Sequence, residues 1–157
     1  MTKILYFIHR VRDPDVATNK ARAYRWIRWL KQAMPDVAVL APWLPYVEAL
    51  DDTLATDRSA AMRDGALMAG LSGISAGIVC GPVISGGCAT DIANLRDYGV
   101  PTISLTDLGF EEPPPLWPEL VGVMRGVVGH AKVLNPDNVV HLRFRGSEPV
   151  FDLVGAF

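Results

Sequence analysis

The feature of this sequence that most constrains its fold is a series of short apolar segments that alternate with helical patterns. The first segment, Lys3 to Ile8, is apolar at nearly every position, which is typical of a strand buried on both faces. Further strands are expected at Val37 to Leu40, Gly77 to Gly81 and Pro101 to Leu105. Because strands that alternate with helices form parallel sheets through right-handed crossovers, the sequence predicts an α/β fold.

Three helices are expected between these strands. The first is predicted to begin at Asp13-Pro14, because Asp is a favoured N-cap and Pro suits a first turn. Pro35 is expected to end it. The bounds expected for the other two helices, and for a long loop after the second strand, are Thr56 to Leu71, Ala89 to Tyr98 and Ala41 to Ala55.

The C-terminal third departs from this alternation. A proline-rich connector, Glu111 to Pro118, is expected to lead to a helix at Pro118 to His130. Asn138 to Phe144 and Val150 to Val154 are then predicted to form a hairpin, which can extend the sheet, cover a face or pair with a second subunit. The predicted fold class is therefore a flavodoxin/Rossmann-like parallel sheet sandwiched by helices, with a C-terminal β-hairpin, in one domain over residues 1–157.

Composition narrows the classes of partner. The chain is 50% hydrophobic and 20% charged, with a formal net charge of −2, so nothing in it indicates nucleic acid or an anionic membrane as a partner. It has no apolar stretch of the ~20 residues that span a bilayer and no features of a signal peptide, so the cytoplasm is the expected location. Cys80 and Cys88 lack metal-ligand companions, and no metal or organic cofactor is expected.

A glycine-rich turn between the third strand and the third helix is the best candidate for a working site. It runs from Gly81 to Gly87, at the edge of the sheet where ligands bind, outside the carboxyl ends of the strands. Glycines there let backbone N–H groups approach an anion, and Ser85 adds a hydroxyl. Asp91 follows in the opening turns of the helix, where the helix dipole alone also favours a carboxylate. Spacing by itself leaves both roles for Asp91 open.

The segment Ser85-x-Gly87-x-x-x-Asp91 belongs to a set of motifs that follow one another along residues 3–108. The others are His9-Arg10-Val11-Arg12 with Asn19 and Ala23, Leu40 to Leu44 followed by Asp51-Asp52, and Arg63 with Gly65. In their order and spacing, these motifs resemble those of the nucleoside 2-deoxyribosyltransferase-like superfamily. That superfamily also contains deoxynucleoside 5′-monophosphate N-glycosidases and many uncharacterised bacterial and phage members.

The resemblance implies an N-glycosidase or deoxyribosyltransferase that cleaves the N-glycosidic bond of a nucleoside or nucleoside 5′-monophosphate. In this superfamily the acidic residue of the signature attacks the anomeric carbon and displaces the base, which assigns the role of nucleophile to Asp91. Serine at the position of Ser85 favours the monophosphate. The residues that the resemblance and the turn assign to substrate binding are His9, Arg10, Trp43, Gly81, Ser85 and Gly87.

The chain differs from the superfamily at three places. Asp91 stands where Glu is usual, Ser72 and Ser75 stand where acidic residues are common, and Trp43 replaces a common His. A catalytically silent nucleotide-binding or regulatory module of the same fold is therefore the alternative hypothesis. Ser85 to Thr90 is also similar to a loop of the lysine-decarboxylase-like phosphoribohydrolases, although Ala93 stands where those carry Glu.

A homodimer is also expected. Trp26 and Trp29 lie on the first helix in addition to its core stripe, where they can pack in the core or form a subunit interface. Exposed apolar surface of this kind usually marks an interface. The terminal hairpin offers an unpaired edge, which proteins normally cover. A two-fold dimer is the commonest way to satisfy both, and members of the resembled superfamily form dimers or larger assemblies.

Overall fold

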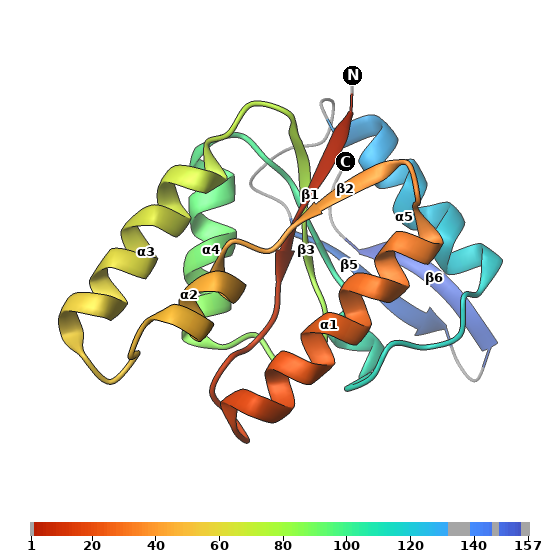
Figure 1. The fold of residues 1–157 in the computed structure, drawn as a ribbon. Helices are drawn as coiled ribbons and strands as arrows, with labels where there is room; N and C mark the ends of the chain where they lie inside the picture. Colours follow the sequence, from red (N-terminus) through yellow and green to blue (C-terminus); the bar gives the residue numbers. More distant parts are fainter. Residues whose placement is uncertain (1, 132–138, 146–147, 155–157) are drawn as a thin grey trace.

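A single twisted sheet forms the centre of the protein, whose computed structural model describes residues 2–131, 139–145 and 148–154 (Figure 1). The strand order is β2-β1-β3-β4-β5-β6. The first five strands are parallel and β6 runs antiparallel to β5. Their bounds are β1 (Lys3–Ile8), β2 (Val37–Leu40), β3 (Ile74–Val79), β4 (Thr102–Ser104), β5 (Val139–Arg145) and β6 (Glu148–Val154). An order of 2-1-3-4-5 is that of flavodoxin-like folds, so the predicted fold class is confirmed.

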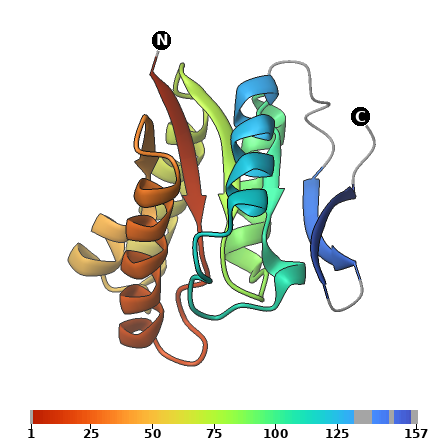
Figure 2. The ribbon, with the colours of Figure 1, turned by 90° about the vertical axis from the view of Figure 1, so that its right-hand side faces the viewer.

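The C-terminal hairpin extends this sheet, which decides among the three arrangements that the sequence left open. Its first strand pairs with β4, from Thr102 opposite Val139 to Ser104 opposite His141. The second strand, β6, is the last of the order and begins two residues earlier than predicted. Figure 2 shows the hairpin at one edge of the sheet. The turn expected around residues 146–147 lies outside the described residues.

Helices cover both faces of the sheet. α1 (Val16–Ala33) and α5 (Pro118–His130) pack on one face, and α3 (Ala55–Ala69) and α4 (Gly86–Asp97) on the other. Successive residues of β1 divide between the two sides, since Leu5 and Phe7 belong to the first core and Tyr6 and Ile8 to the second. A strand buried in this way needs apolar side chains at consecutive positions, as β1 has.

The start of α1 differs from the prediction. Asp15, not Asp13, is the N-cap, and its Oδ1 accepts a hydrogen bond of 2.8 Å from the N–H of Thr18. Asp13 lies in the preceding loop, where its carbonyl oxygen accepts a bond of 2.6 Å from Nδ2 of Asn19. Both residues suit a cap by type, and the additional bond from the Thr18 hydroxyl to Asp15 favours the later start.

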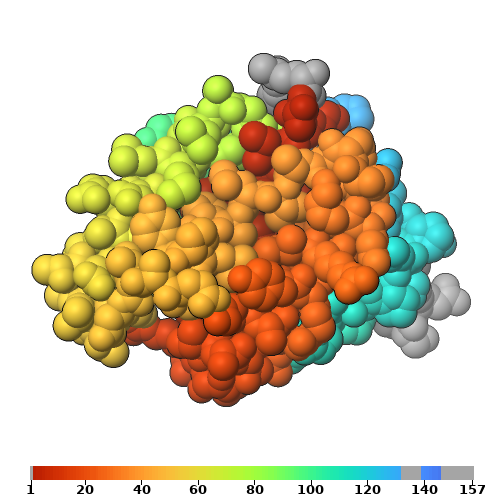
Figure 3. Space-filling model, viewed as in Figure 1, coloured from red at the N-terminus to blue at the C-terminus, as the bar shows by residue number. Residues whose placement is uncertain are grey.

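The predicted loop from Ala41 to Ala55 was wrong, because it contains a short helix, α2 (Trp43–Ala49). This stretch contains two prolines. Pro42 is the N-cap and Pro45 falls in the first turn, where the helix needs no backbone donors and proline is tolerated. Figure 3 shows α1, α2 and α3 forming much of one surface of the molecule.

Two further expectations are corrected. α4 begins at Gly86 rather than near Ala89, since Ser85 caps it, so the last two glycines of the predicted turn are helical. Trp26 and Trp29 are only 1% and 5% exposed and pack edge to face in the core. They therefore offer no surface for a dimer, and the predicted homodimer now depends on the edge strand alone. Among the helices described, none combines the length and apolar character needed to cross a bilayer.

Candidate active site

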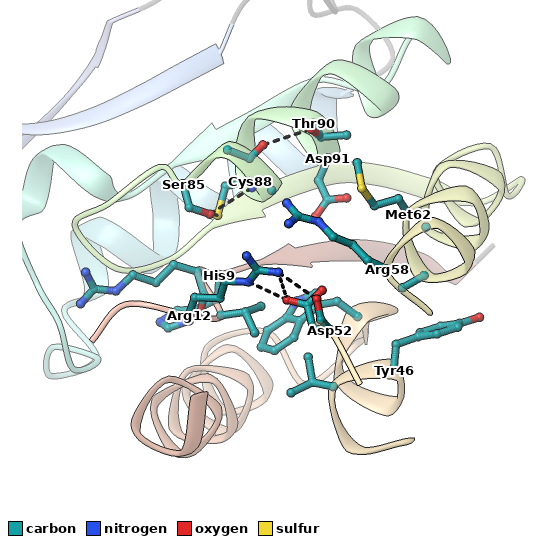
Figure 4. Close-up of a pocket in the computed structure, with 18 of the residues that line it drawn as sticks. His9, Arg12, Tyr46, Asp52, Arg58, Met62, Ser85, Cys88, Thr90 and Asp91 are labelled. Carbon is teal, nitrogen blue, oxygen red and sulfur yellow. Dashed lines mark hydrogen bonds and ion pairs between the residues drawn. The ribbon is translucent and has the colours of Figure 1, made fainter. Parts of the chain in front are cut away.

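A cavity of about 590 Å³ opens at the carboxyl edge of the sheet. It lies beside the point where the strand order reverses, between β1 and β3, which is where ligands of such sheets bind. α3 and α4 form one side, while α2 and the loop after β1 form the other (Figure 4). Six of the seven residues predicted for the site line it, namely Asp91, His9, Arg10, Trp43, Ser85 and Gly87.

Asp91 lies in the second turn of α4 and is largely buried at the cavity wall. Its Oδ1 accepts a hydrogen bond of 3.3 Å from the hydroxyl of Tyr6. Burial raises the pKa of Asp91 from 3.8 to about 6, and the bond from Tyr6 opposes this only in part. A carboxylate that only complements a helix dipole needs neither burial at a cavity wall nor a bond from a distant tyrosine, and Asp91 has both.

Tyr6 is a site residue that was not predicted from the sequence, as are Tyr46, Arg58 and Met62. The sequence predicts Tyr6 only as part of the apolar strand β1. A phenol in a strand that is buried on both faces nevertheless needs a hydrogen-bond partner. Its hydroxyl lies 3.4 Å from the carbonyl oxygen of Gly65 as well as 3.3 Å from Asp91. Burial and the charge of Asp91 raise the pKa of Tyr6, so the phenol stays protonated and acts as a donor.

Ser85 and the two glycines after it form the end of α4 that faces the cavity. The Ser85 hydroxyl caps the helix by accepting a bond of 3.3 Å from the N–H of Cys88. A Cβ at Gly86 would meet nothing within 4 Å, one at Gly87 would meet only Oγ of Ser85 at 3.9 Å, and neither residue has a positive φ. Nothing within the described protein thus requires glycine here, although glycine weakens a helix by about 1 kcal/mol relative to alanine. Both glycines are exposed and line the cavity, so the first turn of α4 is open to it.

Gly81 is the one predicted site residue that does not line this cavity. Its φ of +88° is one that residues with a side chain rarely adopt. A Cβ there would lie 3.3 Å from Nε2 of His9. Glycine at this position therefore allows the turn and the close approach of the imidazole, and contact with a substrate stays a prediction.

His9 is a neutral, oriented group at the cavity wall. It is 4% exposed, and its Nδ1 lies 2.7 Å from the carbonyl oxygen of Arg10. Because a carbonyl can only accept, the proton resides on Nδ1 and leaves Nε2 as an acceptor, for which no partner is found among the described residues. Burial lowers the pKa of His9, and the ring stacks with Phe7 and Trp43 at centroid distances of 6.1 and 6.5 Å.

Arg10 reaches the cavity, but its charge is already paired. One terminal nitrogen donates to both carboxylate oxygens of Glu111, each at 2.7 Å. Arg22 lies 3.1 Å from the same carboxylate. Glu111 belongs to the proline-rich connector, so this cluster fastens the C-terminal part of the chain to the loop after β1. Arg10 therefore has a structural role in this cluster, and its direct contact with a substrate stays a prediction.

Trp43, the first residue of α2, contributes an apolar wall. Its indole N–H donates to the carbonyl oxygen of Phe7 at 3.3 Å, which fixes the ring beside His9. Tyr46 and Met62 extend this wall. Ser72 and Ser75, by contrast, lie at the amino end of β3 and do not line the cavity. The serines at these two positions therefore do not change the set of side chains that line the cavity.

Neither a metal site nor a reactive thiol is found among the described residues of this cavity. Within the described part of the chain, no group of three or more His, Cys, Asp or Glu side chains is placed to hold a metal ion. The thiol of Cys88 lines the cavity, but burial raises its pKa and disfavours the reactive thiolate.

No family model matches this sequence, and no curated protein or solved structure matches it significantly. The case for a function therefore depends on the residues of the cavity and on their geometry.

Proposed function

We propose that this protein cleaves the N-glycosidic bond of a nucleoside or nucleoside 5′-monophosphate, as an N-glycosidase or a deoxyribosyltransferase. The observation that carries the proposal is the Asp91 carboxylate, which is largely buried at the wall of a nucleotide-sized cavity and hydrogen-bonded to Tyr6. Cavities of roughly 300–1,000 Å³ are typical of small-molecule sites. With a pKa of about 6, Asp91 is mostly ionised at neutral pH and can act as a nucleophile.

The reaction proceeds in two displacements. An oxygen of Asp91 attacks the anomeric carbon, and the bond to the base breaks with its electron pair leaving on the base, which takes a proton from water. The resulting glycosyl ester is attacked at the same carbon by water, or by a second base, and Asp91 is released as the carboxylate. The bond from Tyr6 to Oδ1 holds the carboxyl group in one orientation and leaves Oδ2 for the attack.

The remaining walls suit the other parts of such a substrate. The aromatic side of the cavity, Trp43 with Tyr46, offers a surface for the base. The backbone N–H groups of Gly86 and Gly87, which have no partner among the described residues, suit the sugar or a phosphate. The Ser85 hydroxyl lines the same wall, and a substrate would replace its bond of 3.2 Å to the Cys88 sulfur. Asp91 is one methylene shorter than the usual Glu, so the sugar has to approach α4 to within about 3–3.5 Å of the carboxylate. The absence of a Cβ at Gly86 and Gly87 favours that close approach.

The silent nucleotide-binding module remains the competing proposal, and it gives the Asp91–Tyr6 pair no chemical task. Trapping the intermediate separates the two. We expect acid quenching during turnover to leave a glycosyl adduct on the peptide that contains Asp91, detected by mass spectrometry. Asp91→Asn should abolish the adduct, whereas Asp57→Asn, which alters another carboxylate of the cavity wall, should retain it. Base release without an adduct, or an adduct on another residue, would contradict the assignment of Asp91.

A further inference from the structure

The cavity is lined by more carboxylates than guanidinium groups. Whether it can bind an anionic substrate therefore depends on whether any one of its arginines is free to contact the anion. Asp13, Asp52, Asp57 and Asp91 line it, together with three arginines, Arg10, Arg12 and Arg58. A phosphate group that entered this space would be repelled by the carboxylates unless one cation were free to contact it.

Two of the three arginines are already neutralised. Arg10 donates to both oxygens of Glu111. Arg12 forms an ion pair with Asp52, to which its Nε donates at 2.6 Å, and also donates to the carbonyl oxygen of the same residue at 3.2 Å. Both guanidinium groups therefore have carboxylate partners that a substrate would have to displace.

Arg58 is different. It lies in the first turns of α3, and within the described part of the chain its side chain forms no ion pair or hydrogen bond. In Figure 4 the side chain extends from α3 over the cavity, toward the side where Asp91 lies. α3 and α4 are neighbours, and Gly86 and Gly87 line the same cavity with backbone N–H groups that have no partner among the described residues. An unpaired guanidinium and these amides together provide the donors that a phosphate requires.

We propose that Arg58 determines the substrate class, by binding the phosphate of a nucleoside 5′-monophosphate and so selecting it over the free nucleoside. This inference rests on the proposed function. Arg58 does not lie in any of the motifs that resemble the superfamily. The proposed role is therefore argued from this structure alone. Because the side chain is exposed and unpaired, its replacement should leave the fold intact.

The test compares kcat/KM for a deoxynucleoside 5′-monophosphate with that for the same deoxynucleoside. In the native protein we expect the monophosphate to be preferred. Arg58→Gln should lower the ratio of the two values by about 10- to 100-fold, the range expected for one charge-assisted bond, and Arg58→Lys should restore part of it. Arg63→Gln is the matched control, since Arg63 is an exposed arginine of the same helix that does not line the cavity and pairs with Asp64. An unchanged ratio in Arg58→Gln, or a native preference for the nucleoside, would overturn the proposal.

A binding measurement separates failure of this inference from failure of the proposed function. Calorimetric titration of Asp91→Asn with the monophosphate, the nucleoside and inorganic phosphate needs no turnover. Tighter binding of the monophosphate that is lost on adding Arg58→Gln supports the anion site even if no base is ever released. Base release with affinities that do not depend on Arg58 leaves the proposed function standing and refutes the role of Arg58.

Discussion

Asp91 should lower the stability of the folded protein at neutral pH, because its carboxylate is ionised in a largely buried place. Folding raises its pKa from 3.8 to about 6, so the folded state binds the proton more tightly than the unfolded state does. Stability contributed by this group is therefore present at low pH and is lost as the pH rises from about 4 to about 6. Since one pKa unit corresponds to about 1.4 kcal/mol, the loss amounts to at most about 3 kcal/mol.

Asp91→Asn removes this unfavourable charge, and its amide oxygen can still accept the bond from Tyr6. At pH 7.5 we expect the variant to be more stable than the native protein by up to about 3 kcal/mol. This corresponds to a rise of up to about 12 °C in Tm, at roughly 2–4 °C per kcal/mol for a chain of this length. At pH 4 most of the difference should vanish, because the native Asp91 is then protonated in the folded state.

Thermal unfolding followed by circular dichroism at both pH values measures the effect. Asp36→Asn is the control, since Asp36 is 73% exposed in its side chain and should change stability by less than about 0.5 kcal/mol at either pH. The reasoning is refuted if Asp91→Asn is destabilising at pH 7.5, or if its effect on Tm is the same at both pH values. A more stable but inactive variant is the pattern expected when a functional group is held in a place that folding alone would not favour.

Three further predictions concern the cavity and its surroundings. The value of kcat/KM should fall about tenfold per pH unit below pH 6, because attack requires ionised Asp91; a flat profile from pH 5 to 7 would contradict this role. Gly87→Ala should leave Tm unchanged or raise it, as the matched helical change Gly122→Ala should, yet weaken binding of the monophosphate by about tenfold or more. Equal affinity in both variants would show that the space above Gly87 is unused. Glu111→Gln should lower the free energy of unfolding by about 1–2 kcal/mol, because Arg10 and Arg22 lose their shared carboxylate; an unchanged denaturation midpoint would show that this cluster does not fasten the connector.

The sequence was sufficient to predict the parallel sheet, because its strands alternate with helical patterns and β1 is apolar without alternation, as a strand buried on both faces requires. The bounds of β1, β2 and α5 agree with the prediction. α2 was not predicted, and its two prolines are compatible with a helix only because they lie at the N-cap and in the first turn. The predicted start of the first helix was two residues too early, because Asp13 and Asp15 are equally good N-caps by residue type. The hydrogen bonds from Thr18 favour Asp15.

The candidate site was predictable where local rules apply and unpredictable where distant residues meet. The glycines, Ser85 and Asp91 are close in sequence, so a strand, a turn and a helix start suffice to place them together. Tyr6 meets Asp91 across 85 positions of the chain, and Arg10 meets Glu111 across 101. Pairing of this kind depends on the register of β1 against β3 and on the path of the connector, neither of which is encoded in any local pattern. The exposed surface expected at Trp26 was wrong for the same reason, since the connector covers it and Glu111 accepts its indole N–H at 3.2 Å.

Release of free base tests the central claim most directly. The native protein and Asp91→Asn are each incubated with a panel of nucleosides and nucleoside 5′-monophosphates, and free base is measured by chromatography. We predict that the native protein releases base from at least one member of the panel, and that Asp91→Asn, folded and at least as stable, releases none. Base release that persists in Asp91→Asn, or a native protein that releases base from no member of the panel, would contradict it.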